Sequence, residues 1–315
     1  MRAVVFAYHD VGVRCLQVLL ARGVEVALVV THDDNPTETI WFASVKALCA
    51  ERGITCIAPP DPATPVVLEQ VRAACPDMLF SFYYRHMLPA AILACAPRGA
   101  YNMHGSLLPK YRGRVPVNWA VLHGETETGA TLHAMVVKPD AGAIVAQTSV
   151  PILPDDTAAE VFAKVVVAAE QTLWRVLPAM LAGATPNLPN DLAQGSYFGG
   201  RNAEDGRIDW ARPAQEVYNL IRAVAPPYPG AWYMLGQTRV VVESARLPAA
   251  SAQALIAKAI AIKQPIHPRG LMVVDNRVFG LCGDGRIVAV RALRRDNQVL
   301  DAAALEDLLQ SSTHN

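Results

Sequence analysis

The stretch AVVFAYHDVGVRCLQVLLARGVEVALVVT, residues 3–31, places a strand-like apolar run, a helical pattern and a second strand-like run one after another. The apolar runs at 3–8 and 24–31 are too continuous for strands that keep one face in water. Strands of this kind are typical of a parallel sheet whose two faces are both covered by helices. The residues between them, around 11–22, are predicted to form the first such helix.

The same alternation continues beyond this stretch. Helices are predicted around 40–52 and 65–75, and strands at 55–59 and 78–84. Alternating strands and helices indicate an α/β architecture for the first half of the chain. Two further strands at 128–136 and 142–150 precede a long helix that is predicted to end at Gly183.

The pattern changes after a segment rich in Pro, Gly, Asn and Asp at 184–207, which is typical of a linker or surface crossing. One helix near 213–224 is followed by strand-like runs without helices between them. Successive short strands of this kind predict a small β-barrel. We therefore expect two domains, 1–204 and 205–315, with the strands of the second at 231–235, 238–248, 270–282 and 285–295.

Composition excludes several classes of protein. The 28 basic and 28 acidic residues give a net charge of zero, so no overall field favours nucleic acid or an anionic membrane as a partner. No apolar run approaches the ~18 to 20 residues that span a bilayer, and the N-terminus enters a strand without a signal peptide. The six cysteines form no C-x-x-C pair, which favours free thiols in the cytoplasm.

The sequence motifs of two kinds of cofactor site are also absent. The first predicted strand is followed by YHDVGVRC, which lacks the G-x-G-x-x-G phosphate cradle of dinucleotide-binding oxidoreductases. The eight histidines form no H-E-x-x-H motif and no Cys/His cluster, so we expect no metal.

The segment AYNMHGSLLPKYRGR, residues 100–114, contains the strongest candidate site. Asn102 and His104 are two apart, so both side chains point the same way from the end of a strand. Gly105 and Pro109 prevent the strand from continuing. Ligands of open α/β sheets bind beyond the carboxyl ends of the strands, which is where this pair is expected.

The chemistry of these residues suits acyl transfer. An imidazole exchanges a proton near neutral pH, and an amide offers N–H donors to an oxygen that gains charge. Asp140 lies in a predicted tight turn, from which it could orient His104 and raise its pKa. Taken singly, an Asn-x-His pair is more often structural, and an Asp in a Pro-Asp-Ala-Gly turn more often serves the turn itself.

The motifs NMHGSLLPKYRG and GETETGATLHAMVVKPDAGAIVAQ together resemble the formyltransferase family, whose members transfer the formyl group of 10-formyltetrahydrofolate to an amine. The resemblance extends over the chain through VVFAYHD, FSFYYRHMLP and APPYPGAWY. It is strongest to the formyltransferase portion of the bifunctional polymyxin-resistance enzymes. It implies an N-terminal Rossmann-like domain with a parallel-type sheet and a small C-terminal OB-like barrel.

The resemblance also implies site residues. The family's catalytic Asn, His and Asp fall on Asn102, His104 and Asp140, as transition-state stabiliser, proton-transfer residue and modulator of the His pKa. Without the family pattern, RHML would favour a helix start with a capping His. The family's pocket for 10-formyltetrahydrofolate, which would be the co-substrate, falls on His86, Met87, Leu88, Arg114, Val136, Val137, Lys138 and Pro139.

The acceptor amine implied by this resemblance is the 4-amino group of UDP-4-amino-4-deoxy-L-arabinose, on the route to modified lipid A. Lys110, Arg112 and Arg201 are candidates for the diphosphate, and Tyr111 or Tyr197 for stacking on the base. Methionyl-tRNA is disfavoured, because residues 31–46 are acidic where the tRNA enzymes carry a basic insert.

Several alternatives remain open at this stage. They are a methionyl-tRNA formyltransferase, an enzyme for another nucleotide-linked amino sugar, a formyltetrahydrofolate hydrolase, and a non-catalytic folate sensor. The bifunctional enzymes continue into an NAD-dependent decarboxylase domain, whereas this chain stops at Asn315, so we expect the decarboxylase to be a separate protein. The sequence predicts no oligomeric state.

Overall fold

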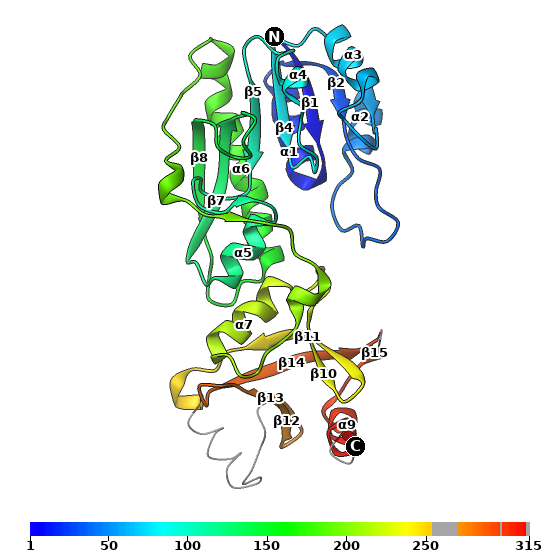
Figure 1. Cartoon of the computed structure of the whole chain (residues 1–315), viewed down its shortest axis with the longest axis vertical. Coiled ribbons are helices and arrows are strands. Elements are labelled where there is room, and N and C mark those ends of the chain that lie inside the picture. Colours follow the sequence, from blue (N-terminus) through cyan, green and yellow to red (C-terminus); the bar gives the residue numbers. More distant parts are fainter. Residues whose placement is uncertain (254–269, 297, 313–315) are drawn as a thin grey trace. The chain divides into compact units, whose positions relative to one another are not determined.

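The computed structural model describes residues 1–253, 270–296 and 298–312 (Figure 1). The chain divides into two compact units. The first unit comprises Met1–Val117, Glu127–Pro151 and Val161–Gly200, and the second comprises Asn118–Thr126, Ile152–Glu160 and Arg201–Asn315. Two short segments of the first half therefore belong to the second unit, which the sequence did not predict.

The first unit is built on one seven-stranded sheet with the strand order β3-β2-β1-β4-β5-β7-β8 (Figure 1). The first five strands in this order pair in parallel, and β7 and β8 pair antiparallel. The predicted α/β fold is thus confirmed, with an antiparallel extension at one edge of the sheet. The strands are β1 (Arg2–Ala7), β2 (Glu25–Val30), β3 (Cys56–Ile57), β4 (Met78–Phe82), β5 (Ala100–His104), β7 (Glu127–Ala134) and β8 (Ile144–Pro151).

Helices connect the parallel strands, as the apolar runs predicted. They are α1 (His9–Ala21), α2 (Val45–Arg52), α3 (Pro65–Ala73) and α4 (Ala90–Leu93), of which α4 was not predicted. Two further helices follow, the unpredicted α5 (Pro116–Leu122) and the predicted long helix α6 (Ala158–Leu181). The start of α2 differs from the predicted residue 40, because the Ser44 side chain caps the helix by accepting a hydrogen bond from the Ala47 N–H. Thr64 caps α3 in the same way, with Pro65 in its first turn.

The core of the first unit explains why its strands are continuously apolar. Every residue of β4 is buried, and Phe80 and Phe82 stack with their ring centroids 5.6 Å apart. Full burial of one such side chain contributes about 1.5 to 3 kcal/mol. Because both faces of the central strands are covered, no alternation of polar and apolar residues remains in them.

The second unit holds a six-stranded antiparallel sheet with the order β10-β11-β14-β13-β12, with β15 paired to β14. The predicted run at 270–282 is divided by a two-residue turn, Asp275-Asn276, whose φ angles of 50° and 56° are those of a hairpin. The elements are β10 (Ala231–Leu235), β11 (Thr238–Arg246), β12 (Gly270–Val274), β13 (Arg277–Leu281), β14 (Ile287–Arg295), β15 (Gln298–Val299), α7 (Ala214–Ala223) and α9 (Ala302–Ser312).

A separate two-stranded ribbon belongs to the first unit. It pairs β6 (Arg112–Gly113) with β9 (Tyr197–Phe198) in parallel, although the two strands lie far apart in the sequence. Short 3₁₀ turns at Leu192–Gln194 and Ala203–Gly206 flank β9.

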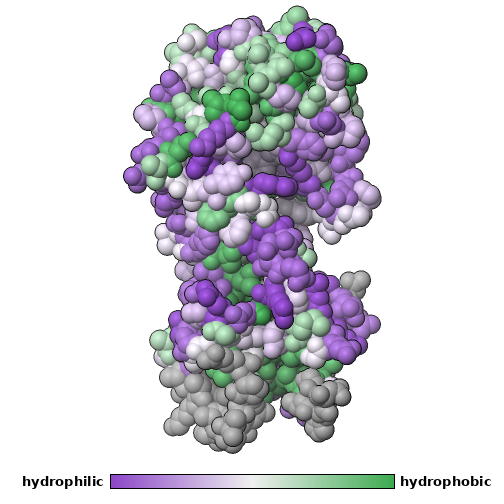
Figure 2. Space-filling view, in the orientation of Figure 1, coloured by the Kyte–Doolittle hydropathy of each residue, from purple (hydrophilic) through white to green (hydrophobic). Residues whose placement is uncertain are grey.

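The surface is mixed in character. Figure 2 shows hydrophilic and hydrophobic residues interspersed over the visible face of each unit. Within the part of the chain that the structure describes, no helix combines the length and the apolar character that crossing a bilayer requires.

Candidate active site

The end of β5 presents Asn102 and His104, as the sequence predicted. In the antiparallel pairing of β5 with β7, Asn102 lies opposite His133 and His104 lies opposite Thr131. The Asn102 Nδ2 lies 3.2 Å from the His133 Nε2. His104 is only 6% exposed, so its ring belongs to the interior of the site rather than to the surface.

Asp140 joins this pair from the connection between β7 and β8. Its Oδ1 lies 3.6 Å from the His104 Nδ1 and 3.4 Å from the His133 Nε2. Its Oδ2 accepts a hydrogen bond of 2.8 Å from the Gly113 N–H. The structure therefore brings Asn102, His104 and Asp140 together, with His133 between the amide and the carboxylate.

The turn that carries Asp140 is held in place by its neighbours. Asp140 has a φ of 49°, a left-handed conformation that is uncommon for residues other than glycine. The Asn190 Nδ2 donates hydrogen bonds to the carbonyls of Asp140 and Gly142, at 3.1 and 2.9 Å. A Cβ at Gly142 would lie 1.9 Å from the Ala134 carbonyl oxygen, so only glycine fits there. These contacts hold the Asp140 backbone in its left-handed conformation and so fix the position of the carboxylate.

The backbone fixes the tautomer of His104. Its Nε2 lies 2.7 Å from the Tyr111 carbonyl oxygen. Because a carbonyl only accepts, the Nε2 must carry a proton, and the Nδ1 is the nitrogen that faces Asp140. The Tyr111 peptide is itself anchored, since its N–H donates to the Ser196 Oγ and its carbonyl also accepts from the Ser106 Oγ. A neutral His104 therefore offers a lone pair at Nδ1.

The pKa of His104 is set by opposing effects. Burial lowers this pKa, and the opposing effects of Asp140 and the Tyr111 carbonyl do not compensate. Asp140 does favour the protonated imidazole, as expected, but the net pKa is lowered because desolvation is the larger effect.

The pKa of Asp140 is shifted as well. Burial alone would raise it, but His104, His133 and the Gly113 N–H together hold it well below its ordinary value. The resting site at neutral pH is therefore a carboxylate beside a neutral imidazole.

Apart from Arg114, the residues predicted for the folate pocket fall in two segments, one after β4 and one after β7. Met87, Val136 and Val137 are exposed, at 57%, 46% and 79%, although their side chains are apolar. Exposed apolar side chains next to polar ones are typical of binding surfaces. Val137 leads directly into Lys138, Pro139 and the turn that carries Asp140.

The other predicted folate residues differ in their surroundings. His86 is exposed, and its ring lies 4.9 Å from the ring of His32. It does not cap a helix, because α4 begins after Pro89. Leu88 is 6% exposed and packs in the core. Arg114 is exposed, and its backbone N–H donates to the Phe198 carbonyl.

The residues predicted for the nucleotide sugar are not all equivalent. Lys110 and Tyr197 are exposed, whereas the Tyr111 ring is buried and stacks on Phe198 at 5.4 Å. Arg112 is only 9% exposed. Arg201 belongs to the second unit, where its guanidinium donates to the Asp205 carbonyl.

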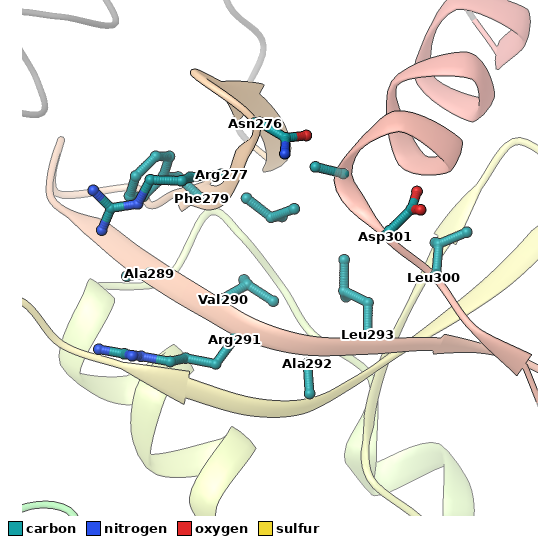
Figure 3. Close-up of a pocket in the computed structure, with 12 residues that line it drawn as sticks. Asn276, Arg277, Phe279, Ala289, Val290, Arg291, Ala292, Leu293, Leu300 and Asp301 are labelled. Carbon is teal, nitrogen blue, oxygen red and sulfur yellow. The ribbon is translucent and has the colours of Figure 1, made fainter.

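Described residues of the second unit line a pair of hollows. Arg201 lines one of about 610 Å³ together with Arg207, Arg212 and Glu216. The other, of about 290 Å³, lies between β13, β14 and the start of α9, and Figure 3 shows the guanidinium groups of Arg277 and Arg291 extending away from Asp301. None of the predicted site residues lines this second hollow.

The sequence missed three contributors to the site. His133 sits in a predicted strand, but only the β5–β7 register shows that it faces Asn102. Asn190 and Ser196 lie in the predicted linker, where no pattern distinguishes them from other polar loop residues. Across the described ranges, which omit 254–269, 297 and 313–315, no three His, Cys, Asp or Glu side chains group as metal ligands would.

Comparison with protein families identifies the family to which the chain belongs. Residues 2–177 match the family model for formyl transferases, and residues 201–306 match the model for the formyl transferase C-terminal domain. The first match covers more than half of the chain.

Solved structures share the fold. WlaRD, a sugar 3N-formyltransferase determined with dTDP and 5-N-formyl-THF, superimposes with a TM-score of 0.71 at 18% identity, covering 95% of this chain and 98% of that one. An N-formyltransferase from Helicobacter canadensis, in complex with folinic acid and dTDP-3-aminofucose, gives 0.65 at 17%, covering 92% and 98%. A 4-N formyltransferase from Francisella tularensis gives 0.60 at 20%, covering 74% and 91%.

Proposed function

Since the chain belongs to the formyl transferase family, we propose that it transfers the formyl group of 10-formyltetrahydrofolate to the amino group of a nucleotide-linked sugar. The observation that carries this proposal is the gathering of Asn102, His104 and Asp140 around one point at the end of β5. These are the groups that acyl transfer to an amine needs: an oxyanion donor, a proton acceptor and a counter-charge.

Asn102 would stabilise the charge that develops on the formyl oxygen. One N–H of its amide is directed at the His133 Nε2, which leaves the second N–H for a ligand. The amide is held by β5 and by its partner across the strand pair, so it needs little reorganisation when charge develops.

His104 would move the proton. The amine nitrogen bonds to the formyl carbon, the Nδ1 of His104 takes a proton from that nitrogen, and the carbon–N10 bond of the folate then breaks. The departing N10 receives the proton from His104, so the site returns to its starting state. In the intermediate imidazolium, the Nε2–H faces the Tyr111 carbonyl and the Nδ1–H faces Asp140, so both donors have acceptors.

The folate would bind against the two segments after β4 and β7. His86, Met87 and Leu88 belong to the first, and Val136, Val137, Lys138 and Pro139 to the second. The exposed apolar groups of Met87 and Val137 are suited to a pterin and benzoyl surface, and the Arg114 guanidinium is suited to a carboxylate. No metal is part of this proposal.

The acceptor that we propose is UDP-4-amino-4-deoxy-L-arabinose, the substrate on the lipid A route that confers polymyxin resistance. The motifs HGSLLPKYRGR and GETETG support this choice. WlaRD and the Helicobacter canadensis enzyme were determined with dTDP or a dTDP-linked amino sugar, which supports the broader class of nucleotide-linked acceptors. We place the reaction in the cytoplasm, because all six cysteines are free thiols.

A tRNA acceptor is less consistent with residues 31–46. Glu38 pairs with Arg85, Asp33 pairs with Lys46, and the Asp34 carboxylate accepts a hydrogen bond from the Tyr8 hydroxyl. The segment thus presents acidic groups that anchor it to the first unit, where a phosphate-binding insert would present unpaired cations.

The test is a side-by-side assay of the purified protein with 10-formyltetrahydrofolate. The acceptors are UDP-4-amino-4-deoxy-L-arabinose, a dTDP-4-amino sugar, methionyl-tRNA, and none. A mass increase of one formyl group on a nucleotide sugar supports the proposal, and preference for the UDP-arabinose supports its finer form. Consumption of folate without an acceptor would instead identify a hydrolase, and binding without turnover would identify a folate sensor.

A further inference from the structure

Arg112 is a buried cation that forms no ion pair with any residue that the structure describes. Its side chain is 9% exposed, and its Nε is enclosed without a hydrogen-bond partner. Among the residues that the structure describes, no carboxylate lies within ion-pair distance of its guanidinium. A charged side chain is rarely buried in this way unless something pairs with it.

Among the described residues, one other arginine, Arg222, is buried, and it does have hydrogen-bond partners. Arg222 is 6% exposed, and its Nε and Nη2 both donate to the Asn219 Oδ1. Its Nη1 donates to the Asp156 carbonyl. Arg222 is thus hydrogen-bonded by the protein itself, whereas the Arg112 Nε has no partner among the described residues.

Burying an unpaired guanidinium costs free energy. The effective penalty for an ion removed from water is several kcal/mol, and the attraction of a well-placed partner is needed to offset it. A buried, unpaired guanidinium therefore binds an incoming anion strongly, because the free energy of removing the cation from water was already spent when the protein folded.

The backbone on either side of Arg112 contacts His104 and Asp140. The preceding carbonyl, of Tyr111, faces the His104 Nε2, and the following N–H, of Gly113, donates to the Asp140 Oδ2. The Arg112 N–H donates to the Ser196 carbonyl, which ties β6 to β9. An anion bound by the Arg112 guanidinium would therefore lie no further than the length of one arginine side chain from the backbone groups that contact His104 and Asp140.

We propose that Arg112 binds the diphosphate of the nucleotide-linked acceptor and thereby fixes the distance between nucleotide and amine. This inference rests on the proposed function, which it deepens by naming the anchor. The planar guanidinium fork matches two phosphate oxygens at once. Of the other predicted diphosphate residues, Lys110 is exposed, and Arg201 belongs to the second unit and donates to a backbone carbonyl there.

The test uses two substitutions of Arg112. Arg112→Met keeps the unbranched stem and removes the charge, and Arg112→Lys keeps the charge and removes the fork. Calorimetry of the full chain would measure the affinities for UDP, dTDP, uridine, thymidine and 5-formyltetrahydrofolate. We expect Arg112→Met to weaken UDP or dTDP binding by about 10- to 100-fold and to leave the nucleosides and the folate within about twofold. Arg112→Lys should fall between.

Arg222→Met is the matched control. It removes a buried arginine that already has protein partners, so it should lower the melting temperature without changing the affinity for UDP. Arg112→Met should not lower the melting temperature, because it removes a buried charge that has no partner.

Several results would overturn the inference. In Arg112→Met, these results are an unchanged affinity for UDP and dTDP, an equal loss of affinity for uridine and UDP, or a loss of affinity for the folate alone. The last would indicate that Arg112 binds the glutamate carboxylate of the folate instead. A wild-type protein that binds neither UDP nor dTDP would also overturn the inference. Failure of the proposed function is a distinct outcome. If the wild type binds UDP through Arg112 but transfers no formyl group, the role of Arg112 stands and the proposed reaction is wrong. If the wild type transfers the formyl group and Arg112→Met does so with the same KM, the proposed reaction stands and the role of Arg112 is wrong.

Discussion

Asn102 and His133 face each other across the β5–β7 pair, with the amide nitrogen 3.2 Å from the imidazole Nε2. The His133 Nδ1 lies 2.8 Å from the Ala134 carbonyl and so carries a proton, which leaves the Nε2 as the acceptor for the amide. The orientation of the proposed oxyanion donor is therefore set by His133, across the strand pair.

The first prediction concerns the donor itself. Asn102→Ala should lower kcat by about 10² to 10³, because one oxyanion donor is lost. Circular dichroism and thermal melting should remain close to wild type, since Asn102 is only partly buried. Asn187→Ala, at an exposed position, serves as the control and should leave kcat unchanged. A folded Asn102→Ala protein with near-normal turnover would remove Asn102 from the mechanism.

The second prediction treats His133 as a positioning residue. His133→Leu should lower kcat by about 10-fold, equivalent to about 1.4 kcal/mol, with little change in KM. In the Asn102→Ala background the same substitution should cost less than it does alone, because no amide remains to be oriented and only the contact of His133 with Asp140 is lost. Additive losses in the double variant would show that His133 acts independently of Asn102.

The third prediction concerns pH. The pKa of His104 is lowered by burial, and the neutral imidazole is the active form, so kcat/KM should rise with pH to a plateau whose midpoint lies below the ordinary value of about 6.5. Asp140→Asn removes the charge that partly opposes this shift. The acid limb should therefore move to lower pH, and the plateau should fall by about 10²-fold because the imidazolium loses its counter-charge.

Asp61→Asn is the control for this measurement, since Asp61 is exposed and only bonds the backbone of its own loop. Its pH profile should overlay that of the wild type. A midpoint above 6.5 in the wild type, or an upward shift in Asp140→Asn, would contradict the assignment of His104 as a neutral base.

The fourth prediction tests the packing behind the catalytic strand. A Cβ at Gly105 would lie 1.9 Å from the Tyr83 hydroxyl oxygen, and Tyr83 itself has a φ of 58°. Gly105→Ala should therefore reduce the free energy of unfolding by about 1 to 3 kcal/mol, the usual range for overpacking. Urea denaturation would measure the loss.

A second substitution distinguishes this clash from a backbone effect. Tyr83→Phe removes the hydroxyl, so the double variant should recover part of the stability lost in Gly105→Ala. If the double variant is no more stable than Gly105→Ala alone, the close approach to Tyr83 is not the cause of the loss.

Much of the first unit could be predicted because its strands are buried on both faces and read as continuous apolar runs. The strand at 78–84 is an example, since all of β4 is buried. The start of α2 was predicted five residues early, because the cap at Ser44 is a local hydrogen bond that periodicity does not reveal. The predicted domain limits, 1–204 and 205–315, remain a prediction.

The candidate site was only partly predictable. Asn102 and His104 stand two apart in one strand, so their common direction follows from strand geometry alone. The position of Asp140 beside them depends on a turn held by Asn190, fifty residues further on. Sequence also ranks Arg112 and Arg201 alike, and only burial separates the enclosed cation from the one in the second unit.

The ribbon of β6 and β9 also bears on how the protein is made. Asn102, His104 and Asp140 leave the ribosome well before Ser196, whose side chain and carbonyl hold the N–H groups of Tyr111 and Arg112. A nascent chain that ends short of Ser196 carries the three proposed catalytic side chains but lacks the hydrogen bonds that hold the Tyr111 peptide, whose carbonyl faces the His104 Nε2. We therefore expect a chain of that length to be inactive and activity to appear only when Ser196 is in place.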